Sequence, residues 1–318
     1  MYKDKVVLLI GGGGTLGHYT AKELLRLGCR VDVLCPEEKT SRQAGLRYLQ
    51  GYGTIETLRA LFETQRYEGI VNFIHYPDAR VYPPVHRLLA ENTGHLIFLS
   101  SYRVYADEQH PITEDAPQLL DTSVDEDFLR REDYALAKSR AERFLAGEPG
   151  IPNWTVVRPV ISFSERRLDI VTRSGREVLE AARSGREMLL PLAAKELTAG
   201  LDWAGNTGKL IANLLFKPHT FGQAYTITSA PGLTWGQVAD IYTRLLGVRF
   251  RWVDTETYME HYGIHGAAQW ILTCDRLFDR AVDNTKVLQA TGLTKADFAT
   301  IEEGIRAELA RIEQEENA

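Results

Sequence analysis

The sequence predicts an α/β fold in which helices cover both faces of a doubly wound parallel sheet. Short apolar runs alternate with helical patterns through the first half of the chain, as expected for parallel strands joined by right-handed crossovers. A glycine-rich turn stands between the first apolar run and the first helical segment. Beyond Pro159 the alternation weakens, which indicates a smaller C-terminal region of mixed α/β structure on the carboxyl edge of the sheet.

Apolar periodicity places the elements of the first half in order. The run Val6–Ile10 is the first strand, and it leads through the glycines into a helix over about 16–27. The segment 54–63 is expected to be helical because Leu58, Leu61 and Phe62 fall on one face. Similar patterns predict strands at 30–34, 46–49, 70–74, 95–100 and 154–158, and helices at about 84–91 and 132–145.

The second half carries fewer strand signals. Thr234 is a typical N-cap residue and opens a helix that is expected to run to Leu246. The chain ends in an amphipathic helix over about 297–313. The other elements expected here are helices near 177–183 and over 206–216, and strands at 224–228 and 249–253.

Composition argues against several classes of protein. The chain has 318 residues, 44% hydrophobic and 25% charged, which is ordinary for a soluble globular protein. No apolar run approaches the roughly 18 residues of a membrane-spanning helix, and no secretory leader is evident, so we expect a cytoplasmic protein without a membrane partner. The net charge of −6 gives nucleic acid no electrostatic footprint, so no nucleic-acid partner is expected.

Cysteine and histidine usage predicts no metal site. Cys29, Cys35 and Cys274 have no metal-ligand spacing, and any disulfide would leave one of them unpaired. The eight histidines show no HExxH or clustered pattern. We therefore expect reduced thiols and no bound metal.

The glycine turn predicts a site for a dinucleotide. Gly11, Gly14 and Gly17 are spaced as G-x-x-G-x-x-G between a strand and a helix, which is the context in which such glycines bind a diphosphate. The helix N-terminus offers N–H groups and a partial positive charge, and glycine lets the backbone approach closely. We predict a dinucleotide-binding, Rossmann-like domain over 1–160, to which segments of about 201–228 return, and a substrate-binding region over 161–318.

A second group of residues predicts proton transfer. Tyr134 and Lys138 are four residues apart on a predicted helix and so share one face. A lysine ammonium favours the phenolate and lowers the pKa of a neighbouring tyrosine, while a serine such as Ser101, at a strand end, can hold a substrate oxygen. Such a Tyr–Lys pair is common on surface helices, but its place after the glycine turn favours a functional interpretation.

These stretches together resemble one family. The sequence resembles the extended short-chain dehydrogenases/reductases, the NAD-dependent epimerase/dehydratase family. The likeness covers nearly the whole chain, and it rests on GGGGTLG at 11–17, LSSYRVY at 99–105, YALAK at 134–138, VVRPV at 156–160 and RAVDNTK at 280–286.

The resemblance implies a role for each matched residue. Ser101 would hold the substrate oxygen, with Ser100 the less favoured candidate, and Tyr134 would be the acid/base. Lys138 would lower the pKa of Tyr134 and bind the nicotinamide ribose. Val160 would lie near the nicotinamide. Residues that would hold the diphosphate are Gly11, Gly14, Thr15, Leu16 and Gly17.

The adenosine side departs from the family pattern. The position that usually carries an aspartate for the ribose is Cys35. Glu37 and Glu38 could replace that carboxylate and favour NAD, whereas Lys39 and Arg42 could hold a 2′-phosphate and favour NADP, or all four could lie in a solvated loop. Because the ribose carboxylate is missing, the cofactor is expected to be NAD(P) with a slight preference for NADP.

Other departures surround the nicotinamide. Tyr52 stands where the family has an aspartate near adenine, and His75 keeps only the first position of the family's histidine–alanine motif. The stretch 75–101 is short by about one helix, so the loop over the nicotinamide must be rebuilt. Tyr102-Arg103 replaces the aspartate–glutamate pair that eliminates water in sugar-nucleotide dehydratases, which argues against that reaction.

Arginines suggest a phosphate-bearing substrate. A guanidinium suits bidentate phosphate recognition, although a solvated basic loop is an equal alternative for this cluster. Arg280 matches an arginine that contacts substrate phosphate in some relatives. The cluster in the expected substrate region consists of Arg166, Arg167, Arg173 and Arg176, of which Arg166 is the candidate ligand.

The sequence therefore favours an NAD(P)-dependent oxidoreductase or epimerase that acts at a secondary alcohol or ketone, most simply of a nucleotide sugar. One alternative is an NADPH-dependent reductase of a small carbonyl compound without phosphate. Another is a non-catalytic dinucleotide- or RNA-binding protein, because fold does not fix function. Relatives commonly dimerise through the helix that carries the Tyr–Lys pair, so a homodimer is expected.

Overall fold

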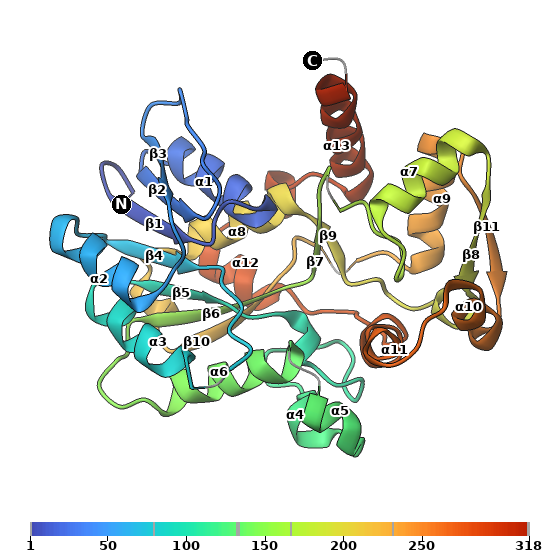
Figure 1. Cartoon of the computed structure of the whole chain (residues 1–318), viewed down its shortest axis with the longest axis horizontal. Helices are drawn as coiled ribbons and strands as arrows, with labels where there is room; N and C mark the ends of the chain where they lie inside the picture. Colours follow the sequence, from blue (N-terminus) through green and yellow to red (C-terminus); the bar gives the residue numbers. More distant parts are fainter. Residues whose placement is uncertain (1, 79, 132–133, 166, 231, 317–318) are drawn as a thin grey trace.

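A seven-stranded parallel sheet forms the centre of the fold, as predicted (Figure 1). The structure is a computed structural model that describes residues 2–78, 80–131, 134–165, 167–230 and 232–316. The strand order is β10-β6-β5-β4-β1-β2-β3, and every neighbouring pair is parallel. The strands are β1 (Val6–Ile10), β2 (Arg30–Cys35), β3 (Leu46–Gln50), β4 (Gly69–Asn72), β5 (Leu96–Leu99), β6 (Trp154–Pro159) and β10 (Gln223–Ile227).

Helices cover both faces of this sheet. Helix α1 packs on α8, and α12 packs on α8 and β10, whereas α2, α3 and α6 pack in series on the other face (Figure 1). The chain order reverses between β1 and β4, so the crevice for a ligand lies at the carboxyl ends of these strands. The helices are α1 (Thr15–Arg26), α2 (Ile55–Thr64), α3 (Tyr82–Glu91), α6 (Ala135–Gly147), α8 (Ala204–Leu214) and α12 (Thr285–Thr291).

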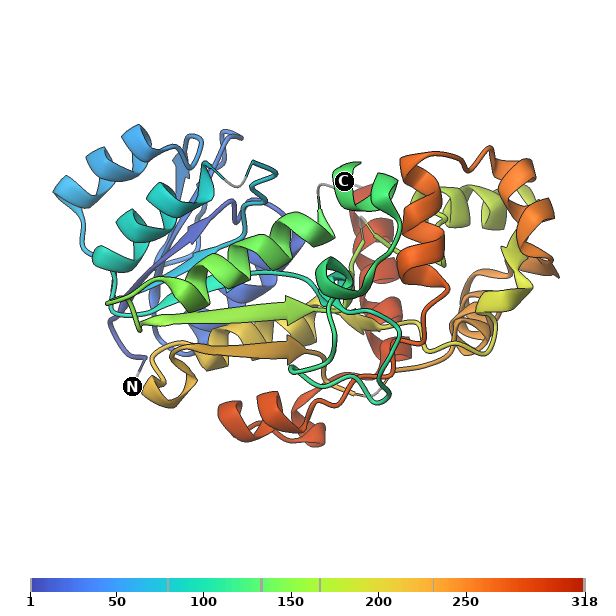
Figure 2. The same cartoon turned by 90° about the horizontal axis from the view of Figure 1, so that it is seen from below.

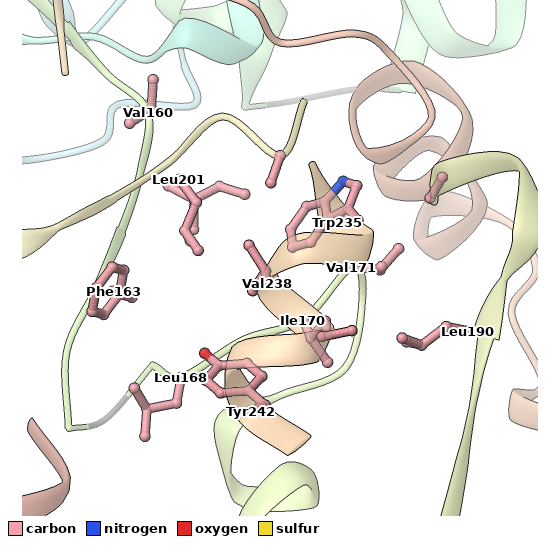
Figure 3. Close-up of a cluster of buried hydrophobic side chains, with 14 of the residues drawn as sticks. Val160, Phe163, Leu168, Ile170, Val171, Leu190, Leu201, Trp235, Val238 and Tyr242 are labelled. Carbon is pink, nitrogen blue, oxygen red and sulfur yellow. The ribbon is translucent and has the colours of Figure 1, made fainter. Parts of the chain in front are cut away.

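The C-terminal region lies beyond the carboxyl ends of the strands. In Figure 2 the arrows of β6 and β10 point toward it. Its core contains Trp235, Tyr242 and Phe163, all fully or almost fully buried (Figure 3). The helices here are α7 (Gly175–Ser184), α9 (Trp235–Leu246), α10 (Thr255–Tyr262), α11 (Ala267–Ile271) and α13 (Ile301–Glu316).

Two small parallel pairs in this region differ in how well the sequence predicts them. Strand β8 (Glu187–Pro191) pairs with β11 (Arg249–Val253), and β7 (Ile161–Phe163) pairs with β9 (Leu201–Trp203). Only β11 was predicted. Strands β7 and β9 have only three residues each, and β8 follows helix α7 closely, so none of the three shows a clear alternation of apolar and polar residues. The short helices α4 (Leu119–Thr122) and α5 (Glu126–Arg131) were missed for the same reason.

The segment after β9 is shared between the two parts of the chain. Helix α8 packs on α1, and β10 pairs with β6 in the main sheet. Helix α12, near the C-terminus, also packs against β10. The division into domains stays a prediction; α8 and β10 lie in the layers of the main sheet, whereas β9 pairs with β7 outside it. Within the described ranges, no helix combines the length and apolar character needed to span a membrane.

Helix α6 is held on the sheet by two buried charged side chains. It begins at Ala135 after Tyr134 as N-cap, later than the predicted start at 132; residues 132–133 lie outside the described residues. The Lys138 ammonium donates hydrogen bonds to the carbonyl oxygens of Ile74 (3.3 Å) and Leu99 (2.5 Å), just beyond β4 and at the end of β5. One turn further, the Glu142 carboxylate accepts from Arg158 of β6.

The pair formed by Glu142 and Arg158 is a buried salt bridge. The two side chains are 7% and 6% exposed, and the shortest N–O distance is 2.5 Å. Glu142 also accepts a short hydrogen bond from the Ser100 hydroxyl, and Arg158 Nη1 donates to Tyr105 Oη and to Glu114 O, both at 2.8 Å. Every charge in this network is therefore compensated, as burial requires.

We predict that Arg158→Met destabilises the protein by about 3–5 kcal/mol, because it leaves the Glu142 carboxylate buried without its cation. Urea unfolding of the variant at neutral pH measures the change. Arg176→Ala is the control, since Arg176 pairs with Glu180 on the surface, and its unfolding midpoint should stay near that of the wild type. Equal midpoints for Arg158→Met and the wild type would contradict the assignment of a structural role to this pair.

Candidate active site

A cavity of about 480 Å³ opens at the carboxyl ends of the strands. It brings together parts of the chain that are far apart in sequence: the glycine turn, the end of β5, the start of α6 and the stretch after β6. Among its lining residues are Gly11, Gly14, Thr15, Leu16, Gly17, Ser100, Ser101, Tyr134 and Val160. Most of the residues predicted for cofactor and catalysis therefore face one space.

The glycine turn has the geometry of a diphosphate site. Gly11 has a positive φ of 70°, and a Cβ on Gly17 would lie 2.1 Å from the carbonyl oxygen of Gly12. Gly14 is the N-cap of α1, no side chain caps the first turn, and the space around it is open. The first N–H groups of α1 are thus available to an anion, and the residues present fit the diphosphate of a dinucleotide.

The two serines at the end of β5 differ in their partners. The Ser100 hydroxyl donates to the Glu142 carboxylate and is committed to the network under α6. The Ser101 hydroxyl accepts from the backbone N–H of Arg103 at 3.2 Å, which leaves its own hydrogen for another acceptor. Of the two, Ser101 is the one that can donate a hydrogen bond to an oxygen in the cavity.

Tyr134 is the N-cap residue of α6, and its half-buried ring lies between two other side chains. The ring of His75 is 5.0 Å away, centroid to centroid, and the guanidinium carbon of Arg103 lies 5.1 Å from the Tyr134 ring centroid. His75 lies in the segment after β4, and Arg103 lies in the 3₁₀ turn Tyr102–Val104 after β5, so both partners of this ring are distant from it in sequence.

Lys138 is close to Tyr134 in the helix but does not line the cavity. Its side chain is buried, and its ammonium lies 4.8 Å from the Phe98 ring centroid as well as on the two carbonyls described above. Burial lowers the pKa of Lys138 to about 7, and the nearby Glu142 carboxylate offsets only part of that effect. The structure thus gives Lys138 a structural contact in addition to its predicted role toward the ribose.

The adenosine side of the glycine turn holds charges of both signs. Cys35, the last residue of β2, lies directly behind Gly13, and burial raises the pKa of its thiol. The Lys39 ammonium donates to the Gly13 carbonyl at 2.7 Å, and a Cβ on Gly13 would lie 2.8 Å from Glu37 Oε2. Glu37 and Lys39 therefore both lie beside Gly13, and Lys39 also lines a neighbouring hollow of about 100 Å³.

The predicted substrate arginines are placed differently from one another. Arg166 lies outside the described residues, while Arg167 lines the main cavity and pairs with Asp169 at 2.8 Å. Arg280 is 1% exposed and does not line the cavity; it donates to the Tyr105 carbonyl at 3.0 Å. Arg173 and Arg176 pair with glutamates on α7.

Several residues that line the cavity are not predicted as site residues by the sequence, and four of them have side chains of interest here. Tyr102 and Arg103 follow Ser101, and Ile271 and Arg276 come from α11 and the π-helical turn after it. π-Helical turns are often found at functional sites. No pattern in the sequence predicts the π-helical turn at Leu272–Arg276.

No cluster of three or more His, Cys, Asp or Glu side chains in the described ranges is arranged to hold a metal ion. The prediction of a metal-free protein rests on the sequence argument and stays a prediction.

Known structures share this fold over almost the whole chain. The epimerase Mth375 from Methanothermobacter thermautotrophicus is 15% identical with a TM-score of 0.71, covering 96% of this chain and 91% of its own. WbmG from Bordetella bronchiseptica, in complex with NAD and UDP, is 16% identical with a TM-score of 0.71, covering 98% and 96%. A UDP-glucose 4-epimerase from Thermotoga maritima, with UDP-glucose, is 15% identical with a TM-score of 0.68, covering 97% and 99%.

No protein-family model and no curated protein matches the sequence. At these identities the structural likeness concerns the fold alone, and it confirms the predicted Rossmann-like α/β fold.

We predict that the burial of Lys138 makes stability rise with pH. The unfolded chain keeps this lysine protonated up to about its ordinary pKa of 10.5, whereas the folded protein releases the proton near pH 7. Between these values the unfolded state binds more protons, so the free energy of unfolding increases by up to about 1.4 kcal/mol per pH unit.

Lys138→Met should remove this part of the slope, and urea unfolding between pH 7 and 10 measures it. Lys22→Met, at an exposed position, serves as control and should keep the wild-type slope. A Lys138→Met slope equal to that of the wild type would show that Lys138 is not the group responsible.

Proposed function

We propose that the protein is an NAD(P)-dependent oxidoreductase or epimerase that acts at a secondary alcohol or ketone, with Ser101, Tyr134 and Lys138 as its catalytic trio. The observation that carries the proposal is the single cavity that joins a diphosphate-binding turn to Ser101 and Tyr134. A glycine turn alone supports only binding. A serine and a tyrosine facing the same space support proton transfer beside the bound dinucleotide.

Each residue has a role that follows from its position. The Ser101 hydroxyl donates a hydrogen bond to the substrate oxygen and orients it toward Tyr134. The Tyr134 hydroxyl takes the proton from an alcohol or returns it to a ketone. Lys138 fixes the start of α6 through its bonds to Ile74 and Leu99, and so holds Tyr134 over the cavity. A nicotinamide dinucleotide, when bound, supplies hydride transfer.

We further propose a nucleotide sugar as the substrate. The structures of the same fold include WbmG with UDP, the Thermotoga epimerase with UDP-glucose, and MoeE5 with NAD and either UDP-glucose or UDP-glucuronic acid. The residues Arg103 and Arg167 line the cavity, and their guanidinium groups suit a phosphate-bearing ligand. The homodimer and the cytoplasmic location stay predictions.

We predict that Tyr134→Phe lowers kcat by about 10²–10⁴-fold, since the phenol is the proton-transfer group. The dissociation constant of the cofactor should stay within about threefold of the wild type, because no bond to the diphosphate is lost. Steady-state kinetics and fluorescence titration of the reduced cofactor measure the two quantities. Full activity of the variant would refute the role of Tyr134, and salt-sensitive RNA binding without redox turnover would favour the non-catalytic alternative.

Cofactor choice is expected to depend on the two charges beside Gly13. Lys39→Ala should weaken NADPH by about tenfold and NADH much less, because an ammonium binds the 2′-phosphate. Glu37→Ala should weaken NADH more than NADPH, since a carboxylate binds the ribose hydroxyls. Titration with both cofactors measures this.

Arg42→Ala is the control for these titrations. Arg42 is exposed and lines neither cavity, so the variant should bind both cofactors like the wild type. If Lys39→Ala weakened both cofactors equally, Lys39 would not distinguish them. The titration of the wild-type protein also tests the slight preference for NADP.

A further inference from the structure

Arginines from two distant segments converge on one buried carboxylate in the cavity wall. Asp275, in the π-helical turn Leu272–Arg276, is fully buried and lies 3.4 Å from Arg103 and 3.3 Å from Arg280, and it forms a shorter pair with Arg276. Burial favours the neutral acid, but the arginines, Arg276 foremost, hold the pKa of Asp275 below its ordinary value. The carboxylate therefore stays ionised and fixes the guanidinium groups around it.

Arg276 is the member of this group that can bind a ligand in a defined geometry. Its side chain is 7% exposed, yet it lines the cavity. Its Nε donates to the Val171 carbonyl and its Nη1 to the Tyr102 hydroxyl, both at 2.9 Å. Within the described part of the chain Nη2 makes no hydrogen bond, so it can donate to a ligand while the rest of the fork is held rigid.

The buried charges around Arg276 are more positive than negative, which favours the binding of an anion. Arg276 and the fully buried Arg280 share the single carboxylate of Asp275. The next carboxylate, Asp169, is paired with Arg167 at 2.8 Å. A buried positive charge without a matching anion is costly, and one negative charge on a ligand would balance it.

Two contacts connect Arg276 and Asp275 to the proposed catalytic residues Ser101 and Tyr134. Arg276 is bonded to Tyr102, the neighbour of Ser101, and Arg103 connects Asp275 to the ring of Tyr134. An anion on Arg276 therefore belongs to the part of the substrate that reacts and not to a distant diphosphate. A carboxylate supplies the single charge, and its planar geometry matches a guanidinium.

We propose that Arg276 binds a carboxylate carried next to the reacting carbon, so that the substrate is a hydroxy or keto acid, such as a nucleotide-linked uronic acid. The inference rests on the proposed function, because it takes Tyr134 as the group that meets the reacting oxygen. It deepens that function by naming the acidic class of substrate and the residue that selects it.

Two pairs of probes that differ only in a carboxylate test the proposal. UDP-glucuronate is compared with UDP-glucose, and lactate with propylene glycol, each titrated into the full-length protein in the presence of the oxidised cofactor. The wild type should bind the acid of each pair about tenfold more tightly than the alcohol. Arg276→Gln should bind both members equally. Arg167→Gln is the matched control from the same cavity and should keep the preference.

The outcomes separate this proposal from the proposed function. If both UDP-sugars bind equally to the wild type, the nucleotide-sugar proposal stands and the carboxylate site is refuted. If neither UDP-sugar binds but lactate is preferred over propylene glycol, and the preference disappears in Arg276→Gln, the carboxylate site stands without the nucleotide. A carboxylate preference that persists in Arg276→Gln, or that is absent for both pairs in the wild type, overturns the inference.

Because Arg276 is buried, its glutamine variant could lose the fold, which circular dichroism and thermal melting would reveal. Arg276→Lys then replaces it. The ammonium keeps the charge but not the planar fork, so the preference for the acid should fall severalfold. An unchanged preference in a folded Arg276→Lys protein would equally count against the proposal.

Discussion

The docking of α6 onto the carboxyl ends of the strands is the constraint on which the site depends. Tyr134, Lys138 and Glu142 follow one another at successive turns of the chain. Lys138 bonds the carbonyls just beyond β4 and at the end of β5, and Glu142 bonds Ser100 and Arg158. A charged group buried in this way is stable only with its partners in place, so the position of Tyr134 relative to Ser101 is fixed by the same bonds that hold the helix.

A second set of contacts holds the glycine turn from the opposite side. The buried carboxylate of Glu308 on α13 accepts a bond from Trp203 Nε1 at 2.6 Å and a shorter one from Tyr19 of α1. The hydroxyls of Thr15 and Ser164 lie 2.9 Å apart. The C-terminal helix therefore braces the helix whose N-terminus lies at the proposed diphosphate site, so segments of the second half of the chain support that proposed site.

The lining of the cavity differs from what the family pattern implies. Arg280, the arginine expected to meet substrate phosphate, is buried against backbone carbonyls. Arg276, from a turn with no sequence signature, lines the cavity instead. The replacement of an acidic pair after Ser101 by Tyr102 and Arg103 removes the groups for dehydration and adds positive charge beside Tyr134. These changes give the cavity wall more positive charge than the family pattern implies.

The sequence by itself determined the parallel sheet, the glycine turn and the order of the catalytic candidates, because apolar periodicity and glycine spacing are local properties of the chain. It missed the short strands β7, β8 and β9, which have no period of their own. Only the tertiary structure decided which of two adjacent serines is free to bind a ligand, which arginines face the cavity, and that Lys138 is buried. Those outcomes depend on partners far away in sequence, such as Glu142 for Ser100 and Tyr102 for Arg276, and no local pattern encodes such partners.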